Sequence, residues 1–104
     1  MTQQNIYTKD RYYEAILQLR PNNTLLHLFV KNQLARRKNV FISKEIIAKH
    51  GIDLYLTDKK FAREIAKKLK QNFNGTIKTS AALYTRDRQT SKLVYRLTVC
   101  FRLK

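Results

Sequence analysis

The stretch HGIDLYLTDKKFAREIAKKLK, residues 50–70, decides the fold because a strand-like segment passes directly into a helix-like one. Its first part, IDLYLT, follows a second strand-like segment, NVFISKEIIAK, and only His50 and Gly51 separate the two. A two-residue connection of this kind is typical of a β-hairpin, in which glycine supplies a positive φ. We therefore expect an antiparallel pair of strands here.

The second part of the stretch predicts an amphipathic helix. Thr57 or Asp58 is placed to cap its first turn. Asn74 and Gly75 are placed to end it, with Gly75 in the left-handed conformation that follows many helices. The apolar residues recur at the i, i+4 spacing of a buried helix face. They are Phe61, Ala62, Ile65, Ala66, Leu69 and Phe73.

The flanking sequence adds one helix and three strands. Residues 12–20 alternate apolar and polar side chains, as strands do, and Pro21 ends them. A helix is expected over residues 25–38, where the basic residues 36–38 suit the negative end of the helix dipole. Residues 76–86 and 92–104 form two closing strands around the polar turn DRQTS. The expected inward side chains are Leu25, Leu26, Phe29 and Val30 of the helix, and Leu93, Tyr95, Leu97, Val99, Phe101 and Leu103 of the last strand.

The predicted order β-α-β-β-α-β-β indicates an α+β fold. It corresponds to a ferredoxin-like sandwich with an extra C-terminal strand, in which two helices cover one face of a mainly antiparallel sheet. The pattern leaves open whether the fifth strand extends the edge or takes an inner position. Residues 11–104 are expected to form a single domain, and the polar, aperiodic residues 1–10 a disordered tail or linker.

The charge balance points to an anionic partner. The 104 residues include 22 Lys and Arg against 7 Asp and Glu, a formal net charge of +15. Such a surplus repels itself in a compact state unless an anion neutralises it, so RNA, DNA and an anionic membrane are the candidate partners. No apolar run approaches the roughly 18 residues of a membrane span, and the start lacks the apolar core of a signal peptide. We therefore expect a cytoplasmic protein that does not enter a membrane.

The second predicted helix concentrates the basic charge on one side. At 100 degrees per residue, Lys60, Arg63, Lys67 and Lys70 fall within about 80 degrees of one another. Like charges at i and i+4 destabilise a helix by roughly 0.2 to 0.5 kcal/mol each, and only Glu64 is close enough to offset them. Contact with a polyanion is one interpretation of this stripe, and a solvated lysine-rich face is the other.

The open face of the sheet is a second candidate surface. It would carry basic side chains on the last strand and Gln18 and Arg20 on the first, joined by Lys78, Tyr84 and Arg86 if the fourth strand keeps its alternation. Basic residues with an interleaved tyrosine suit phosphate contact and base stacking. A partner domain covering Val94, Thr98 and Cys100 is the alternative. The candidate RNA-binding residues are Lys59, Lys60, Arg63, Lys67, Lys70, Arg86, Lys92, Arg96 and Arg102.

Catalysis has little support in the sequence. The carboxylates are scattered, and Asp53, Asp58 and Lys60 imitate a metal-dependent nuclease cluster only faintly, because Asp58 is better explained as a helix cap. Cys100 is the single cysteine, so neither a disulfide nor a paired-cysteine zinc site can form, and we interpret it as a small buried apolar residue. We expect no enzyme activity, no metal and no cofactor.

Three segments together resemble a known family. YYEAILQLR, GIDLYLTDKKFAREIAKKLKQNFNGTIKTSAAL and LVYRLTVCFRL are similar to the middle α/β domain of the large-ribosomal-subunit export adaptor family, historically named for nonsense-mediated mRNA decay. The resemblance covers about residues 11–104, is sharpest at residues 51–55, and is greatest to archaeal members. It implies binding to the maturing large ribosomal subunit, with ribosomal RNA and ribosomal proteins as partners.

The chain departs from the full family pattern in two ways. The paired-cysteine zinc region expected before this domain and the β-rich domains expected after it are absent, so neither metal binding nor exportin recruitment is carried over. An excised domain and a natural stand-alone relative both remain open. The main hypothesis is a non-catalytic ribosome-associated domain that contacts ribosomal RNA through its basic helix. The alternative is a protein-interaction scaffold whose positive charge is incidental.

Overall fold

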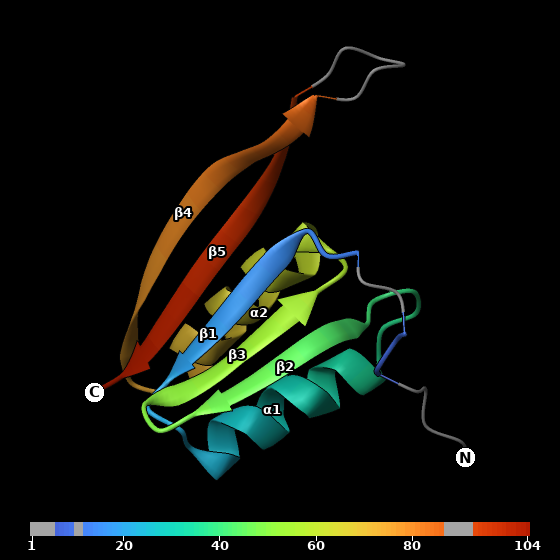
Figure 1. Cartoon of the computed structure of the whole chain (residues 1–104). Coiled ribbons are helices and arrows are strands. Elements are labelled where there is room, and N and C mark those ends of the chain that lie inside the picture. Colours follow the sequence, from blue (N-terminus) through green and yellow to red (C-terminus); the bar gives the residue numbers. More distant parts are fainter. Residues whose placement is uncertain (1–5, 10–11, 87–92) are drawn as a thin grey trace.

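The computed structural model describes residues 6–9, 12–86 and 93–104 and confirms the α+β class. Two helices and five strands follow in the predicted order (Figure 1). They are β1 (Ala15–Arg20), α1 (Thr24–Ala35), β2 (Ile42–Ala48), β3 (Gly51–Leu56), α2 (Lys59–Asn72), β4 (Gly75–Arg86) and β5 (Leu93–Leu103).

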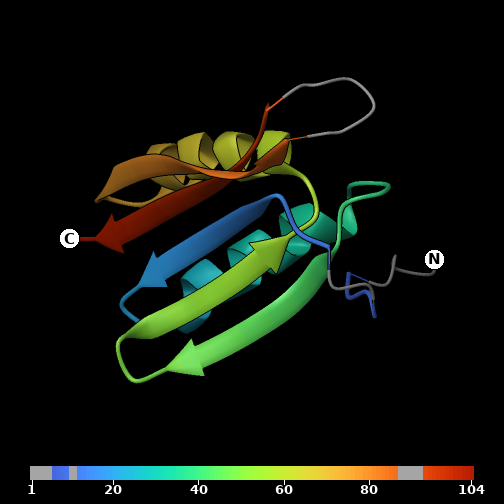
Figure 2. The ribbon, with the colours of Figure 1, turned by 45° about the horizontal axis from the view of Figure 1, so that its top comes forward.

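The five strands form one mixed, mostly antiparallel sheet in the order β2-β3-β1-β5-β4 (Figure 2). Without β5 the order is the ferredoxin-like one. The extra strand therefore takes an inner position, between β1 and β4, and this settles the alternative that the sequence left open. Its pairing with β1 is parallel, whereas β1–β3, β2–β3 and β4–β5 are antiparallel.

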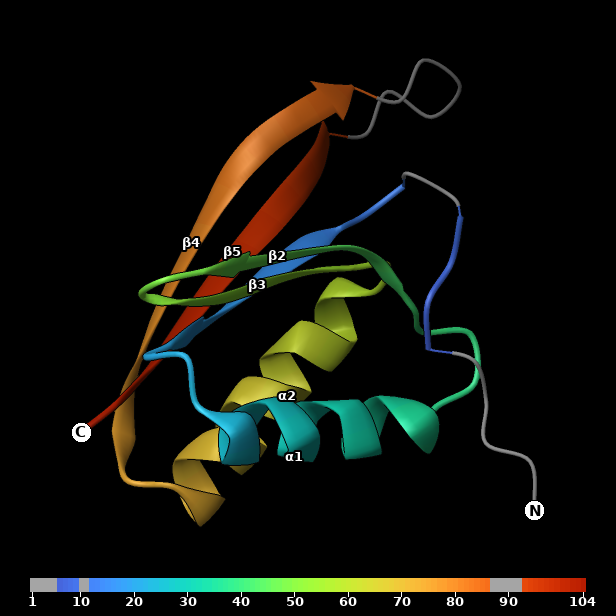
Figure 3. The same cartoon turned by 60° about the horizontal axis from the view of Figure 1, so that its bottom comes forward.

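Both helices lie on the same side of the sheet (Figure 3). Alternate residues of β1, β3 and β5 point to this side and are buried, as a sheet with one covered face requires. The core between helices and sheet is formed by apolar side chains alone among the described residues. The largest are Phe61, Phe101, Leu17, Leu19, Leu26, Leu34, Ile42, Leu54, Leu56, Ile65 and Leu69.

The hairpin of β4 and β5 extends beyond the rest of the sheet (Figure 1). Residues 97–102 of β5 pair with both β1 and β4, whereas residues 93–96 pair with β4 alone. Among the described residues, no third strand pairs with this projecting end. Leu83 and Tyr95 are partners across the hairpin there, and they remain 58% and 42% exposed although the alternation predicts Tyr95 inward.

The first helix is shorter than predicted. It begins at Thr24 and ends at Ala35, three residues before the expected end, because the backbone NH groups of Arg36 and Arg37 donate to the carbonyl groups of Gln33 and Leu34 in a tighter final turn. The basic residues 36–38 thus follow the helix. Leu25, which was expected to face inward, is 66% exposed, and the buried face consists of Leu26, Val30 and Leu34.

Both glycines occupy positions where the chain allows no side chain. Ala48 pairs with Gly51, so the hairpin turn consists of Lys49 and His50, one residue earlier than predicted. Gly75 does not have the predicted positive φ. A Cβ atom at Gly75 would lie 2.5 Å from the carbonyl oxygen of Arg102, so close packing of β4 on β5 accounts for this glycine.

Residues 6–8 lie against the start of β2. Tyr7 forms a parallel β-bridge with Ile42. The Ile42 backbone NH donates a hydrogen bond to the Ile6 carbonyl at 2.6 Å, and the Ile42 carbonyl accepts one from the Thr8 NH at 3.0 Å. The ammonium group of Lys31 lies 5.4 Å from the centre of the Tyr7 ring. This part of the segment predicted as a disordered tail or linker is therefore attached to the sheet, and residues 1–5 and 10 lie outside the described residues.

Candidate nucleic-acid interface

The second helix is held firmly at its start. Asp58, one of the two predicted caps, is the N-cap, and its carboxylate accepts a hydrogen bond from the Lys60 backbone NH at 2.9 Å. The Glu14 carboxylate accepts from the Lys59 NH at 3.1 Å. Two NH groups that have no partner within the helix are thus satisfied by carboxylates, which also suit the positive end of the helix dipole.

The basic side chains of α2 lie together, as the wheel predicts. Four of them are exposed, namely Lys60, Arg63, Lys67 and Lys70, and Lys59 is half-buried beside them. We call these five residues the basic stripe. None of the five forms an ion pair with an acidic residue in the part of the chain that the structure describes.

The neighbouring side of α2 faces α1 instead. Glu64, the single acid of α2, forms an ion pair with Arg37, which follows α1 and also lies 5.7 Å from the centre of the Phe61 ring. Lys68 donates to the Gln33 side chain at 3.2 Å. The one carboxylate within α2 is therefore paired with a residue outside the basic stripe.

Three residues of the basic stripe, Lys59, Arg63 and Lys67, line one wall of a groove, and the β4–β5 hairpin forms the other wall. We call it the α2–hairpin groove. It consists of two adjoining pockets of about 300 Å³ each, both lined by Arg63. The outer pocket, towards the projecting end of the hairpin, is lined by Lys59, Arg63, Ala81, Tyr95 and Leu97, and the inner one by Arg63, Ala66, Lys67, Ile77, Thr79 and Val99.

The composition of the groove favours an anion. Its lining contains three cations and no carboxylate among the described residues, and the remaining side chains are apolar or small apart from Tyr95. Arginine can bind a phosphate through two parallel hydrogen bonds, and lysine binds one as a point charge. The arrangement can therefore bind phosphate groups along the cations, with an aromatic side chain on the opposite wall.

Arg96 and Arg102 lie on the opposite face of the sheet from the basic stripe. Register places both on the open face, since they alternate with the buried residues Leu97, Val99 and Phe101. The nine predicted RNA-binding residues therefore do not form one surface.

Arg96 is engaged within the fold. Its guanidinium group lies 3.8 Å from the centre of the Tyr13 ring and donates to the Tyr13 carbonyl and hydroxyl oxygens at 3.2 and 3.1 Å. These contacts attach the segment before β1 to β5. Arg96 thus has a structural role that the alternation pattern did not reveal.

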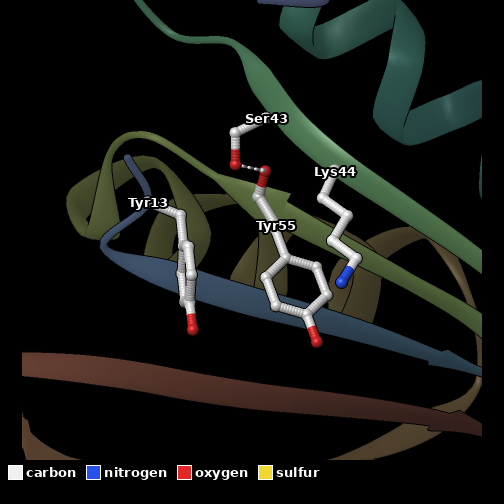
Figure 4. A pocket seen from close by; sticks show the side chains of 4 residues that line it. All are labelled: Tyr13, Ser43, Lys44 and Tyr55. Carbon is white, nitrogen blue, oxygen red and sulfur yellow. Dashed lines mark hydrogen bonds between the residues drawn. The ribbon is translucent and has the colours of Figure 1, made fainter. Parts of the chain in front are cut away.

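Tyr13 is the first of three neighbouring side chains on the open face, followed by Tyr55 and Lys44 (Figure 4). Its ring meets that of Tyr55 edge to face, with centroids 4.8 Å apart, and the Lys44 ammonium lies 5.5 Å from the Tyr55 ring centre. Together with Ser43 these residues line a pocket of about 540 Å³. Figure 4 shows the two tyrosine hydroxyl groups pointing the same way.

Arg102 lies at the end of the sheet, where it lines a pocket of about 400 Å³. Lys49 and His50 of the β2–β3 turn share this pocket with Arg20. Arg20 is paired with Asp53, the guanidinium nitrogen lying 2.8 Å from the carboxylate oxygen, so its charge is compensated. Among the predicted residues of the open face, Arg102 and Lys78 are exposed.

Three predicted residues remain, namely Lys92, Tyr84 and Arg86. Lys92 lies outside the described residues, as do the side chains of Tyr84 and Arg86. The pairing register of β4 with β5 shifts between Leu83 and Thr85, so β4 does not keep a regular alternation. The prediction for Tyr84 and Arg86 required that alternation.

Tyr95 is the residue of the groove that sequence reasoning missed. It was assigned to the core because it alternates with Leu97 and Val99. The sequence did contain a signal for its exposure. The predicted last strand is longer than the predicted first strand, so some residues of the last strand can have no partner in the first.

The carboxylates do not form a metal site in the part of the chain that the structure describes. Asp53 pairs with Arg20, and Asp58 caps α2. Cys100 is half-buried on the open face and is not in the core, because even-numbered residues of β5 point away from the helices.

The fold and these surfaces define an α+β sandwich domain with a basic helix along one side of its helical layer. The family model described as NMD3, second domain, matches residues 12–103, nearly the whole chain. The chain therefore belongs to the NMD3 family, which is associated with the handling of the large ribosomal subunit. This confirms the family and the middle domain that the sequence resembles. A comparison with curated proteins gives no match. No helix in the described segments is long and apolar enough to span a membrane.

Proposed function

We propose that the chain is a non-catalytic ribosome-associated domain that contacts ribosomal RNA phosphates through the basic stripe of α2. One observation carries the proposal: five basic side chains share one side of a well-capped helix, and its single acid, Glu64, is paired with Arg37. None of the five side chains is then neutralised by an ion pair within the described fold. A polyanion relieves their mutual repulsion by neutralising several charges at once.

Family membership favours RNA as the polyanion. A domain of a ribosomal-subunit adaptor acts next to a surface rich in phosphate. We further propose that the domain is of the archaeal type and works in the cytoplasm, in maturation or quality control of the large subunit. Support for the archaeal type comes from the sequence resemblance.

A fourfold charge reversal tests the role of α2. The first variant changes Lys60, Arg63, Lys67 and Lys70 to Glu. The matched control changes four exposed basic residues elsewhere on the sheet and its turn to Glu, namely Lys44, Lys49, Lys78 and Arg102. Both lower the net charge equally. We expect the first to lose at least tenfold more affinity for large-subunit RNA than the control. Equal losses would show that net charge alone acts, and parent-like binding by the first would refute the helix assignment.

The non-catalytic part of the proposal has its own test. If the domain were a nuclease built on the scattered carboxylates, Mg²⁺ would stimulate RNA cleavage, and Asp53→Ala would abolish it. We expect intact RNA after incubation with Mg²⁺ for both proteins. Metal-dependent cleavage by the parent that is lost in the variant would contradict the proposal.

A protein-interaction scaffold is the second candidate, and two exposed leucine side chains on α1 favour it. Leu25 and Leu28 share one side of α1, and they are 66% and 53% exposed. Two results would together favour this candidate. Cross-linking to large subunits would reach only proteins, and the affinity for RNA would be no better than that of any equally charged cation.

A further inference from the structure

We infer that the α2–hairpin groove binds single-stranded RNA and that a base stacks on Tyr95. This inference rests on the proposed function, because Lys59, Arg63 and Lys67 of the basic stripe line the groove. It adds the form of the RNA and a base-contacting residue. The evidence lies in the spacing of the cations, the exposure of Tyr95 and the shape of the groove.

The cations are spaced to follow a nucleic-acid backbone. Lys59, Arg63 and Lys67 are separated by four residues each, so they form a row with a rise of about 6 Å from one to the next. The row runs along the groove for about 12 Å and passes from the outer pocket to the inner one. Successive phosphates of an extended strand can therefore each meet one cation.

Tyr95 presents an aromatic surface directly opposite this row. Its side chain lines the outer pocket together with Lys59 and Arg63, and it is 42% exposed. Leu83, its partner across the hairpin, is 58% exposed and adds apolar surface beside it. An aromatic ring next to cations is the arrangement by which proteins hold unpaired bases, because every base has a π face.

The position of Tyr95 selects a single strand over a duplex. In an A-form duplex the bases are stacked inside and the phosphates lie outside, so a duplex could touch the basic stripe but could offer no base to a side chain in a groove. An unpaired strand can turn its bases towards Tyr95 while its phosphates follow the lysines and Arg63. An acidic peptide would use the cations without needing the ring.

The test measures binding of a short uridine oligonucleotide, an RNA duplex of the same length and a polyglutamate peptide to the whole chain. The variants are Tyr95→Leu, which removes the ring, and Tyr95→Phe, which keeps it. Tyr7→Leu is the control, since Tyr7 is exposed to the same extent, 42%, and lies beside Lys31 of α1, outside the groove. We expect Tyr95→Leu to weaken oligonucleotide binding about tenfold or more. Tyr95→Phe and the control should stay within about twofold of the parent, and duplex binding should be the same in all.

The outcomes separate this inference from the proposed function. Oligonucleotide binding that is lost in the fourfold α2 variant but unchanged in Tyr95→Leu would overturn the inference and leave the proposed function standing. Equal loss for the oligonucleotide and the duplex, or equal competition by polyglutamate, would also overturn it. If the parent bound no RNA, both would fail. If Tyr95→Leu did not fold, photo-cross-linking of a thiouridine oligonucleotide to the parent would replace it. We expect the adduct on Tyr95. Adducts confined to the open face would overturn the inference.

Discussion

The guanidinium group of Arg96 stacks on the ring of Tyr13, 3.8 Å from its centre, and donates hydrogen bonds to two oxygens of the same residue. The two residues come from β5 and from the segment before β1. This contact joins the last strand of the chain to the start of the first, next to the point where β5 leaves the main sheet.

We expect Arg96→Met to destabilise the domain by about 1 to 2 kcal/mol, because both the cation–π contact and the hydrogen bonds are lost. Arg102→Met is the control: Arg102 is exposed on the same face of the same strand, and its removal should cost less than about 0.5 kcal/mol. Urea denaturation measures both. Equal losses would show that the Tyr13 contact is unimportant for stability.

Gly75 offers a test of why β4 begins as it does. A Cβ atom there would lie 2.5 Å from the Arg102 carbonyl oxygen and from a ring carbon of Phe101. We expect Gly75→Ala and Gly75→Asn each to cost at least about 1 kcal/mol, since either must push the backbone of β5 away. Asparagine tolerates left-handed backbone better than alanine. Thermal unfolding measures both variants. If Gly75→Asn were clearly more stable than Gly75→Ala, the left-handed backbone predicted from the sequence would be favoured instead.

Lys31 should make stability depend on pH in the alkaline range. Burial alone would lower the pKa of Lys31, but a hydrogen bond with Tyr7 and the negative charge of Glu45, 3.5 Å away, raise it above the usual 10.5. A raised lysine pKa stabilises the fold fully below pH 10.5, and this contribution is lost as the pH rises through the folded-state value.

The parent should therefore be more stable than Lys31→Met by about 0.2 to 1 kcal/mol near neutral pH. Chemical denaturation at several pH values should show this difference holding up to about 10.5 and shrinking above it. A difference that persisted unchanged at higher pH would mean that Lys31 stabilises through packing and not through its charge.

Local patterns predicted α2 well. Its buried residues Phe61, Ile65 and Leu69 follow from spacing along one element, and the structure confirms them. The cap was narrowed to two neighbouring residues, of which the structure shows Asp58. The same wheel gives all of the basic stripe except Lys59. These features depend on the 3.6-residue period of one helix and need no knowledge of its neighbours.

The inner position of β5 and the groove could not be predicted in this way. A strand carries the same alternation whether it lies at an edge or between two others, so pattern does not reveal its neighbours. Alternation places Arg96 on a face but does not show that Tyr13 covers it. It places Tyr95 on the helical side but does not show that β1 ends before reaching it.

The most direct test of RNA contact through α2 is co-sedimentation of the chain with large ribosomal subunits over a range of salt concentrations. Each neutralised phosphate adds about 0.7 to 0.9 to the slope of log affinity against log salt. We predict that the fourfold α2 variant lowers this slope by about 3, whereas the charge-matched sheet variant leaves it nearly as in the parent. Equal slopes for the two variants, or a parent-like slope for the α2 variant, would contradict RNA contact through the basic stripe.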